Sequence, residues 1–463
     1  MDTLQIPQQI NAANRLDRLP ITRFHRIMVA AVAFAYFYEF ADINSFSITA
    51  ARVRQIWTTV TIAQVSYVTA VSFVGMFIGA VIAGGLADRY GRKRVLVIST
   101  LEYAIFSLIG AFSWNIAALG TFRVLTSAGL AAMTVVAAVY INEMFPKASR
   151  GKYQALAIVI GICGTPATNF IASAVISLNP WSWRLVYVWG ALGIFFVFFI
   201  VHLKESPRWF VGRGRFAEAE AVLTEIEQRV ERESGQPLPP AAPPVVEVAQ
   251  PKATLKTLLQ KKYLFPTILL SVLWITQTIG FFGYSSWAPT LLSAQGVSVQ
   301  KATIYVALST IGAPLGSWIA SLVTDRFERK WSLVVFGLII AVSGLLYGLT
   351  LNPIMIVAFG FCVNMFERGY TALGYAYSPE LYDTYARSLG TSFSYGIGRL
   401  SNAFAPLLIA ALYTGSGAGY KHVFFFIAGT WAVGAIVLAI FGPATRRLRL
   451  EQEAQEQAAL AAA

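Results

Sequence analysis

Six ionisable side chains stand out within long apolar stretches of this 463-residue chain. They are Glu39, Asp42, Arg123, Glu367, Arg368 and Arg399. A charge at the centre of a bilayer costs at least about 2.5 to 3.5 kcal/mol, so it usually faces a cavity or a partner and marks an ion or substrate pathway. These six residues are therefore the first candidates for chemistry.

Glu39 and Asp42 are three positions apart. On a helix this spacing puts both carboxylates on one face, about 5–6 Å from each other. Burial and like charge both favour the protonated form, so two such groups in a poorly hydrated site tend to share a proton. The pair predicts a proton-coupling site.

Arg399 carries a planar guanidinium that matches a carboxylate through two parallel hydrogen bonds, and Gly398 beside it would leave room for a ligand. The alternative is an arginine that bonds backbone carbonyls between packed helices. Glu367 and Arg368 are read either as substrate contacts or as a local ion pair. Tyr284 and Trp287 flank Ser285 and Ser286, and are candidates for either substrate contact or packing.

Long apolar runs decide the class of protein. The chain is 56% hydrophobic and 13% charged, whereas soluble domains carry about 25% charged residues. A bilayer core needs about 20 apolar helical residues to be crossed. We predict twelve membrane helices near 24–50, 61–86, 95–113, 116–144, 154–178, 185–203, 264–292, 302–324, 332–350, 353–379, 391–414 and 422–442.

The distribution of the net charge of +13 gives the orientation. With the N-terminus inside, 28 Lys and Arg residues fall on cytoplasmic segments and five on outer ones, which is the bias of a membrane protein with cytoplasmic termini. The surplus charge therefore meets anionic lipid and is not a nucleic-acid site. We expect a monomeric, multi-pass protein of the plasma membrane, such as a bacterial inner membrane.

An internal repeat divides the chain into halves. Asp88-Arg89-Tyr90-Gly91-Arg92-Lys93 and Asp325-Arg326-Phe327-Glu328-Arg329-Lys330 are 237 positions apart, and so are Tyr140, Glu143 and Arg150 from Tyr377, Glu380 and Arg387. Two motifs at one offset predict two parallel six-helix bundles that move about a central site. The predicted gating residues are Asp88, Arg92, Glu143, Arg150, Asp325, Arg329, Glu380 and Arg387.

The repeat also distinguishes charged residues that recur in both halves from those that occur in one half only. At the same offset none of the six intramembrane charges has a charged counterpart, which favours a functional role for them. Gly84 and Gly85, at the end of the second predicted helix, are expected to let a neighbouring backbone approach closely.

The predicted domains are an N-terminal arm (1–23), a first bundle (24–203), a cytoplasmic linker with short helices (204–263), a second bundle (264–442) and a cytoplasmic tail (443–463). The linker contains a proline-rich segment, 237–244, and acts either as a tether or as a regulatory element.

Gly84-Gly85-Leu86-Ala87-Asp88-Arg89-Tyr90-Gly91-Arg92-Lys93 resembles the signature loop of the major facilitator superfamily. Glu205-Ser206-Pro207-Arg208-Trp209 resembles the sugar-porter branch and its relatives, which include niacin and aromatic-acid proton symporters and organic-ion transporters. The segments 282–290 and 395–400 are similar to the niacin and aromatic-acid symporters. In such symporters an acid in helix 1 pairs with an arginine in helix 4; this implies a pair of Asp42 and Arg123, with Glu39 as an outer acid.

The resemblance implies a proton-coupled importer of a small organic solute by alternating access, here an aromatic or pyridine monocarboxylate. Two rival substrate classes remain: a sugar or polyol, bound through Gln277 or Asn364, and an organic cation. A non-transporting sensor is a further alternative, disfavoured by the short linker. No Walker-type phosphate loop, nucleophile triad or metal cluster is visible, so we expect neither an enzyme nor a cofactor, and the partners are substrate, proton and lipid.

Overall fold

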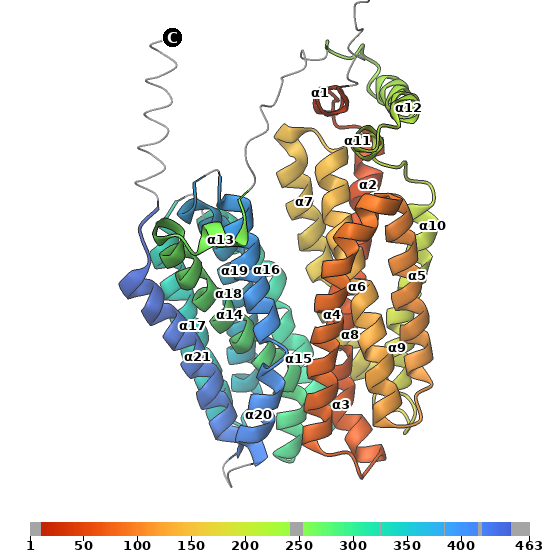
Figure 1. Ribbon diagram of the computed structural model, residues 1–463. Coiled ribbons are helices and arrows are strands. Elements are labelled where there is room, and N and C mark those ends of the chain that lie inside the picture. The colour runs from red at the N-terminus through yellow and green to blue at the C-terminus, as the bar shows by residue number, and fades with distance from the viewer. Residues whose placement is uncertain (1–10, 241–252, 324–325, 384, 415–418, 446–463) are drawn as a thin grey trace, which may run out of the picture. The chain divides into compact units, whose positions relative to one another are not determined.

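The computed structural model describes residues 11–240, 253–323, 326–383, 385–414 and 419–445, and within these ranges every regular element is a helix (Figure 1). The elements before residue 240 are α1 (Ala12–Asp17), α2 (Arg23–Ile43), α3 (Ser45–Ile56), α4 (Ile62–Tyr90), α5 (Arg92–Ala111), α6 (Ile116–Met144), α7 (Lys147–Ile162), α8 (Gly164–Val175), α9 (Arg184–Ala191), η1 (Leu192–Phe195), α10 (Phe196–Ile200), α11 (Pro207–Gly212) and α12 (Phe216–Ser234). The later elements are α13 (Leu255–Leu258), α14 (Lys261–Ala294), α15 (Val299–Thr310), α16 (Gly312–Val323), α17 (Arg329–Leu349), α18 (Pro353–Tyr377), η2 (Ser378–Leu381), α19 (Arg387–Ser401), α20 (Ala405–Thr414) and α21 (Gly419–Phe441).

Twelve of the described helical segments account for the predicted membrane helices. Ten are long and apolar enough to cross a bilayer, and Arg184–Ile200 is a shorter apolar helix. The twelfth is α18, which has 25 residues and carries Glu367 and Arg368. The prediction of an all-helical chain with twelve spans is confirmed for the part of the chain that the structure describes.

Several predicted single helices are broken near their middle. The first breaks at Asn44, between α2 and α3, and the fifth at Cys163, between α7 and α8. The eighth breaks at Ile311, and the eleventh between Ser401 and Ala405. Such breaks free backbone groups from the helical ladder, which in a membrane requires partners from neighbouring segments or a polar cavity.

The described residues form two compact units. Unit 1 lies within 1–43, 75–165 and 187–249, and unit 2 within 44–74, 166–186 and 250–463. Segments 44–74 and 166–186 of the predicted first bundle thus belong to unit 2. The predicted domain boundaries remain a prediction.

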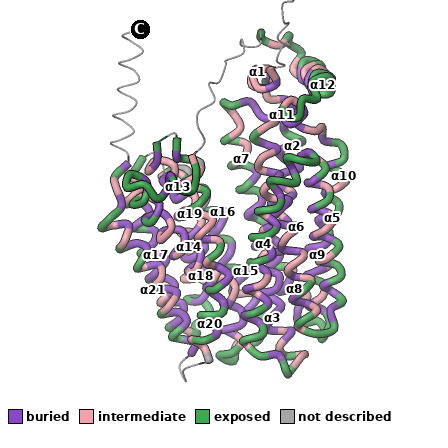
Figure 2. Tube along the Cα trace, viewed as in Figure 1, coloured by how far each residue is buried: buried purple, intermediate pink, exposed green. Residues whose placement is uncertain are grey.

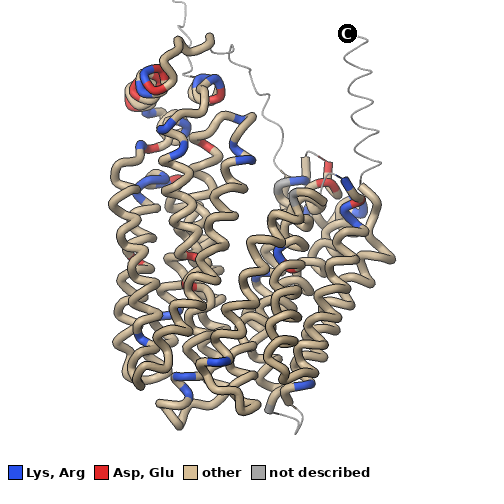
Figure 3. The backbone as a smooth tube through the Cα atoms, turned by 180° about the vertical axis from the view of Figure 1, so that it is seen from behind, with Lys and Arg blue, Asp and Glu red and all other residues tan. Residues whose placement is uncertain are grey.

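Large apolar side chains are exposed along the long helices of both units (Figure 2). Val81 is 63% exposed, Phe198 74% and Ile354 80%. In water such surfaces would drive association, whereas in a bilayer they face lipid. Charged residues, in contrast, gather mainly toward the helix ends, notably around α1, α11 and α12 in unit 1 (Figure 3).

Close packing of α4 on α6 depends on two glycines other than the expected pair. A Cβ at Gly75 would lie 2.4 Å from the Val124 carbonyl oxygen, and one at Gly79 would lie 2.1 Å from that of Ala128. At Gly84 and Gly85 a Cβ would meet no described atom within 4 Å. The expectation for Gly84 and Gly85 is therefore wrong: Gly75 and Gly79, four residues apart, form the small-residue face.

Candidate functional site

Asp42 and Arg123 form a buried ion pair in unit 1. The Arg123 Nη1 donates to Asp42 Oδ2 at 2.6 Å, and the side chains are 0% and 4% exposed, respectively. Arg123 lies about two turns after the start of α6, and Asp42 lies in the last turn of α2. The structure thus joins the two residues that the family resemblance paired.

The two oxygens of the Asp42 carboxylate differ. Oδ2 accepts from Arg123, whereas Oδ1 is buried and accepts no hydrogen bond from the described residues. A Cβ added at Gly190 would lie 3.1 Å from Oδ1, so α9 closes one side of it. A buried oxygen with unused hydrogen-bonding capacity is costly.

Glu39 lies one helical turn before Asp42 and is 6% exposed. It acts electrostatically on Tyr36, whose hydroxyl accepts a 2.6 Å hydrogen bond from Gln154 Nε2. Asp42 takes Arg123 as its ion-pair partner, and the role of Glu39 in proton coupling stays a prediction.

In unit 2, Glu367 is the centre of a polar cluster between α14 and α18. Its Oε1 accepts 2.8 Å hydrogen bonds from Gln277 Nε2 and from Thr371 Oγ1. Its Oε2 lies 3.4 Å from Arg368 Nε. The cluster is therefore more than the local pair considered as an alternative, because it reaches Gln277 of the neighbouring helix.

Arg399 lies on α19 beside an aromatic group. Its Nε donates to the Tyr395 hydroxyl at 2.7 Å, and the guanidinium carbon is 5.2 Å from the Tyr395 ring centroid. Gly398 does not open space for a ligand as expected: a Cβ there would lie 2.7 Å from Trp274 Cβ. Gly398 instead lets α19 approach α14.

The remaining predicted substrate residues are buried inside unit 2. Tyr284 and Trp287 are 2% and 1% exposed, and Tyr284 packs edge-on against Tyr347. Asn364 is also buried, and its Nδ2 donates to the Gly360 carbonyl of its own helix at 2.8 Å. In this structure all three side chains are packed inside unit 2, and their role in substrate binding stays a prediction.

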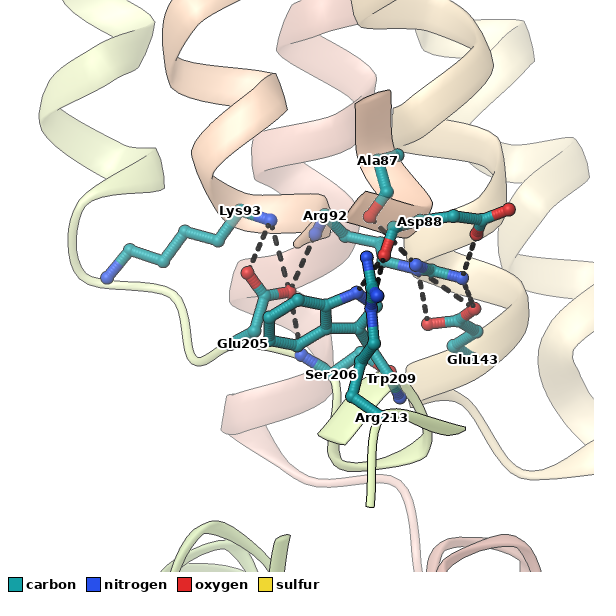
Figure 4. Close-up of polar contacts among 9 residues, drawn as sticks. All are labelled: Ala87, Asp88, Arg92, Lys93, Glu143, Glu205, Ser206, Trp209 and Arg213. Atoms are coloured by element: carbon teal, nitrogen blue, oxygen red, sulfur yellow. Dashed lines mark hydrogen bonds and ion pairs between the residues drawn. The ribbon is translucent and has the colours of Figure 1, made fainter. Parts of the chain in front are cut away.

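The first signature loop forms a charge cluster at one end of unit 1 (Figure 4). Arg92 binds Glu143 through Nε and Nη2 at 2.8–3.0 Å, and its Nη2 also lies 3.0 Å from Asp88 Oδ1. The Asp88 side chain is 75% exposed, whereas that of Glu143 is 18% exposed. Glu143 is therefore the stronger partner of Arg92, because exposed ion pairs contribute little.

Glu205 is a second acid of this cluster that was not among the predicted gating residues. Its carboxylate accepts from the backbone N–H groups of Arg92 and Lys93 at 2.8–3.2 Å, at the start of α5, where the helix dipole favours an anion. Gly91 comes directly before α5 and has a φ of +100°. A Cβ at this position would lie 2.3 Å from Glu205 Oε2. The Glu205–Trp209 motif was the available signal, and Trp209 Nε1 indeed donates to the Asp88 carbonyl at 2.6 Å.

The second signature loop repeats the main contact. Arg329 pairs with Glu380, and these two residues are each 237 positions after Arg92 and Glu143. Asp325 lies outside the described residues. Arg150 pairs with Asp17 at 3.5 Å, whereas its counterpart Arg387 is exposed at the start of α19. The equivalent pairs lie in the two halves as the repeat predicts; the gating role of all eight residues stays a prediction.

The N-terminal arm was not among the predicted sites, yet it is tied to the linker. Arg15 of α1 binds Glu227 of α12 through two hydrogen bonds of 2.7 and 2.9 Å, and Arg18 binds the same carboxylate at 2.7 Å. Glu233 accepts from the Phe24 N–H at the start of α2 at 2.7 Å. We call α1 and α12 together the cytoplasmic cap.

Asp17 links the cytoplasmic cap to two further helices. Its Oδ1 accepts from the Lys147 N–H at the first residue of α7 at 2.9 Å, and it lies 3.3 Å from the Arg208 guanidinium of α11. Carboxylates of the cap therefore contact the N-termini of both α2 and α7, where negative charge is favoured.

Known proteins share this sequence and fold. The profile of the family "Sugar (and other) transporter" matches residues 26–456. The Bacillus subtilis protein described as "Putative metabolite transport protein YyaJ" is 45% identical over 94% of this chain and 96% of its own length. The niacin transporter NiaP of Acinetobacter baylyi is 26% identical over 96% of this chain and 99% of its own.

The crystal structure of a D-xylose–proton symporter superposes with a TM-score of 0.73 and covers 91% of this chain and 98% of its own. At 15% sequence identity this likeness shows the fold alone. With the family match across nearly the whole chain, it confirms the predicted architecture of two six-helix bundles with cytoplasmic termini. The chain is a multi-pass membrane transporter and not an enzyme: it belongs to the sugar (and other) transporter family of the major facilitator superfamily.

Proposed function

We propose that this transporter is a proton-coupled symporter that imports a small aromatic or pyridine monocarboxylate through a bacterial inner membrane. The observation that carries the coupling is the Asp42–Arg123 ion pair: both groups are buried, and Asp42 Oδ1 accepts no hydrogen bond from the described residues. Support for the solute comes from the niacin transporter among its relatives, since niacin is a pyridine monocarboxylate.

The coupling follows from electrostatics. While Asp42 is ionised, it neutralises Arg123 in a site that excludes water, and breaking that pair would leave a buried charge uncompensated at a cost of about 3–5 kcal/mol. A proton on Asp42 removes the Coulomb attraction and leaves Arg123 as the uncompensated charge, so α2 and α6 must rearrange at this point until the arginine meets water or another partner. Proton binding and helix movement are thereby linked, as symport requires.

Arg399 supplies the cation for the substrate carboxylate. Its Nε donates to the Tyr395 hydroxyl, and a guanidinium is a planar group that matches the geometry of a carboxylate. The aromatic side chains of Trp274, Tyr375 and Tyr395, whose ring centroids are 5.0–5.5 Å apart, adjoin it and would pack against an aromatic solute.

The test uses proteoliposomes with an imposed pH gradient and radiolabelled nicotinate. We expect Asp42→Asn to abolish accumulation against a gradient while exchange of internal for external nicotinate persists. Glu102→Gln, an acid of α5 outside this site, is the control and should accumulate normally. Undiminished accumulation by Asp42→Asn would exclude Asp42 as the proton carrier.

The substrate class is tested separately, by binding of nicotinate and nicotinamide to wild type and to Arg399→Lys. A carboxylate site predicts that the acid binds far better than its amide and that Arg399→Lys weakens the acid. Equal binding of acid and amide would instead favour the sugar or neutral-solute alternative, in which Gln277 or Asn364 substitutions cause the loss.

A further inference from the structure

Glu102 is an acid in the middle of a membrane helix, and neither the proposed proton coupling nor the proposed solute binding uses it. It is the eleventh of the 20 residues of α5, so it lies about 15 Å from the start of the helix, halfway through a bilayer core. It is partly exposed, and within the part of the chain that the structure describes no side chain hydrogen-bonds to it or acts on it electrostatically. A carboxyl group in hydrocarbon is stable only in its neutral form, and its O–H and C=O then still need partners.

Glu102 belongs to the face of α5 that turns away from the rest of unit 1. Along this face, at spacings of four and three residues, the side chains are large, apolar and exposed: Ile98, Ile105 and Ile109 of α5, and Phe112 directly after it. With its other faces the helix packs against α6, η1 and α10, and it runs along the edge of unit 1 in Figure 1. We call Ile98, Glu102, Ile105, Ile109 and Phe112 together the α5 stripe.

The second half of the chain contains the same stripe without the acid. At the offset of 237, α17 is equivalent to α5, and the apolar positions of the α5 stripe correspond to Val335, Val342, Leu346 and Leu349. These four side chains are exposed as well. At the position of Glu102, however, α17 has Ile339. Contact with lipid therefore needs only apolar residues at this place, and the acid is an additional feature that needs a partner of its own.

A second copy of the chain offers the partner that Glu102 lacks. The spacing of the α5 stripe, four and then three residues, is that of helices packed side by side through alternating a and d positions. Two copies related by a twofold axis along the bilayer normal would bring their α5 helices together in parallel, with Glu102 facing Glu102. A neutral carboxyl group is both donor and acceptor, so two of them satisfy each other. Any other protein would have to supply a matching polar group at the same depth.

We propose that the α5 stripe is a homodimer interface within the membrane, in which the Glu102 carboxyl groups of two copies hydrogen-bond to each other. The isoleucines of the stripe pack around this pair, and their van der Waals contacts contribute the rest of the association. The inference does not rest on the proposed function, because it requires only the membrane fold. Each protomer keeps its own Asp42, Arg123 and Arg399, so the interface governs association and not the binding of proton or solute.

Association is measured by energy transfer between donor- and acceptor-labelled full-length protein in liposomes, over a range of protein-to-lipid ratios. Glu102→Ile, which installs the residue of α17, should weaken association about five- to thirty-fold, the factor that corresponds to the 1–2 kcal/mol or so of an interhelical hydrogen bond. Glu102→Gln keeps a donor and an acceptor, so it should associate as wild type does. Ile339→Val, a change at the equivalent position of α17, is the matched control and should have no effect.

Cysteine cross-linking gives a second readout that leaves the acid in place. With Cys163 and Cys362 replaced by serine, Ile105→Cys should form a disulfide between two copies on mild oxidation. Val342→Cys, at the equivalent position of α17, should react far more slowly. A protein that stays monomeric at every protein-to-lipid ratio, or a Glu102→Ile variant that associates as strongly as wild type, would overturn the proposal. Ile105→Cys that cross-links no faster than Val342→Cys would overturn it too, since it would indicate random encounters.

Discussion

Arg15→Ala should loosen α1 from α12 within the cytoplasmic cap. The Arg15–Glu227 pair consists of two parallel hydrogen bonds, and the side chains are 19% and 13% exposed. Exposed pairs contribute about 0.2–1 kcal/mol, and hydrogen bonds to charged groups about 1.5–3 kcal/mol. Because Arg18 still binds Glu227 in the variant, we expect a local loss of about 1–2 kcal/mol, or a five- to thirty-fold rise in cap opening.

The pair should also weaken in acid. Burial alone would raise the pKa of Glu227, but the hydrogen bonds from Arg15 and Arg18 lower it below its ordinary value. A lowered pKa in the folded state means that the stabilisation is complete above the ordinary carboxyl pKa and is lost as the pH falls through the folded one. Cap opening should therefore be constant around neutral pH and increase only in acid.

Hydrogen exchange measured by mass spectrometry on α1 and α12 is the direct assay. Arg15→Ala should exchange five- to thirty-fold faster in both helices, and Arg15→Lys, which keeps the positive charge beside Glu227, should recover part of the protection. Glu225→Gln is the matched control, because Glu225 pairs with Lys204 in an exposed ion pair, with side chains 55% and 40% exposed. Unchanged exchange in Arg15→Ala, or equal effects of Arg15→Ala and Glu225→Gln, would refute this reasoning.

Three further predictions follow from packing and charge. Gly79→Ala should destabilise the protein by about 1–3 kcal/mol through overpacking against α6, whereas Gly84→Ala should change its stability by no more than about 0.5 kcal/mol. The two variants differ only in position along α4, and thermal unfolding of both measures the difference. Glu143→Gln should lower stability more than Asp88→Asn, because Glu143 is the less exposed partner of Arg92; equal unfolding temperatures would contradict it. Glu205→Gln should destabilise the first turn of α5 by about 1 kcal/mol, because it removes the negative charge at the helix N-terminus. The backbone amides of Arg92 and Lys93 should then exchange hydrogen faster, and unaltered exchange there would count against this role.

Sequence alone could predict the features that depend on local pattern. Apolar runs indicated twelve spans because a bilayer imposes a minimum length on each. The repeat identified Arg92, Glu143, Arg329 and Glu380 as equivalent positions of the two halves, and the structure adds that they form the pairs Arg92–Glu143 and Arg329–Glu380. Family resemblance, rather than spacing, joined Asp42 to Arg123, which are 81 positions apart.

Contacts between distant helices were less predictable. Gly84, Gly85 and Gly398 were assigned from their small size, but size does not say which neighbour a glycine faces. The contact of Glu367 with Gln277 spans 90 positions and depends on how α14 and α18 pack, which no local pattern records. The cytoplasmic cap was missed for a similar reason: short polar segments carry charges that pair only after the chain has folded.

The buried acids Asp42 of unit 1 and Glu367 of unit 2 have different kinds of partner. In unit 1 one acid and one arginine, Asp42 and Arg123, neutralise each other directly at 2.6 Å. In the proposed mechanism a proton on Asp42 removes the negative charge that neutralises Arg123, so the helices must then move until the arginine meets water or another partner. In unit 2 the buried acid Glu367 instead accepts hydrogen bonds from the neutral side chains of Gln277 and Thr371, and it lies 3.4 Å from Arg368 Nε. In the proposed cycle, proton binding at Asp42 is linked to solute binding through helix movement, because each ligand favours one arrangement of the helices.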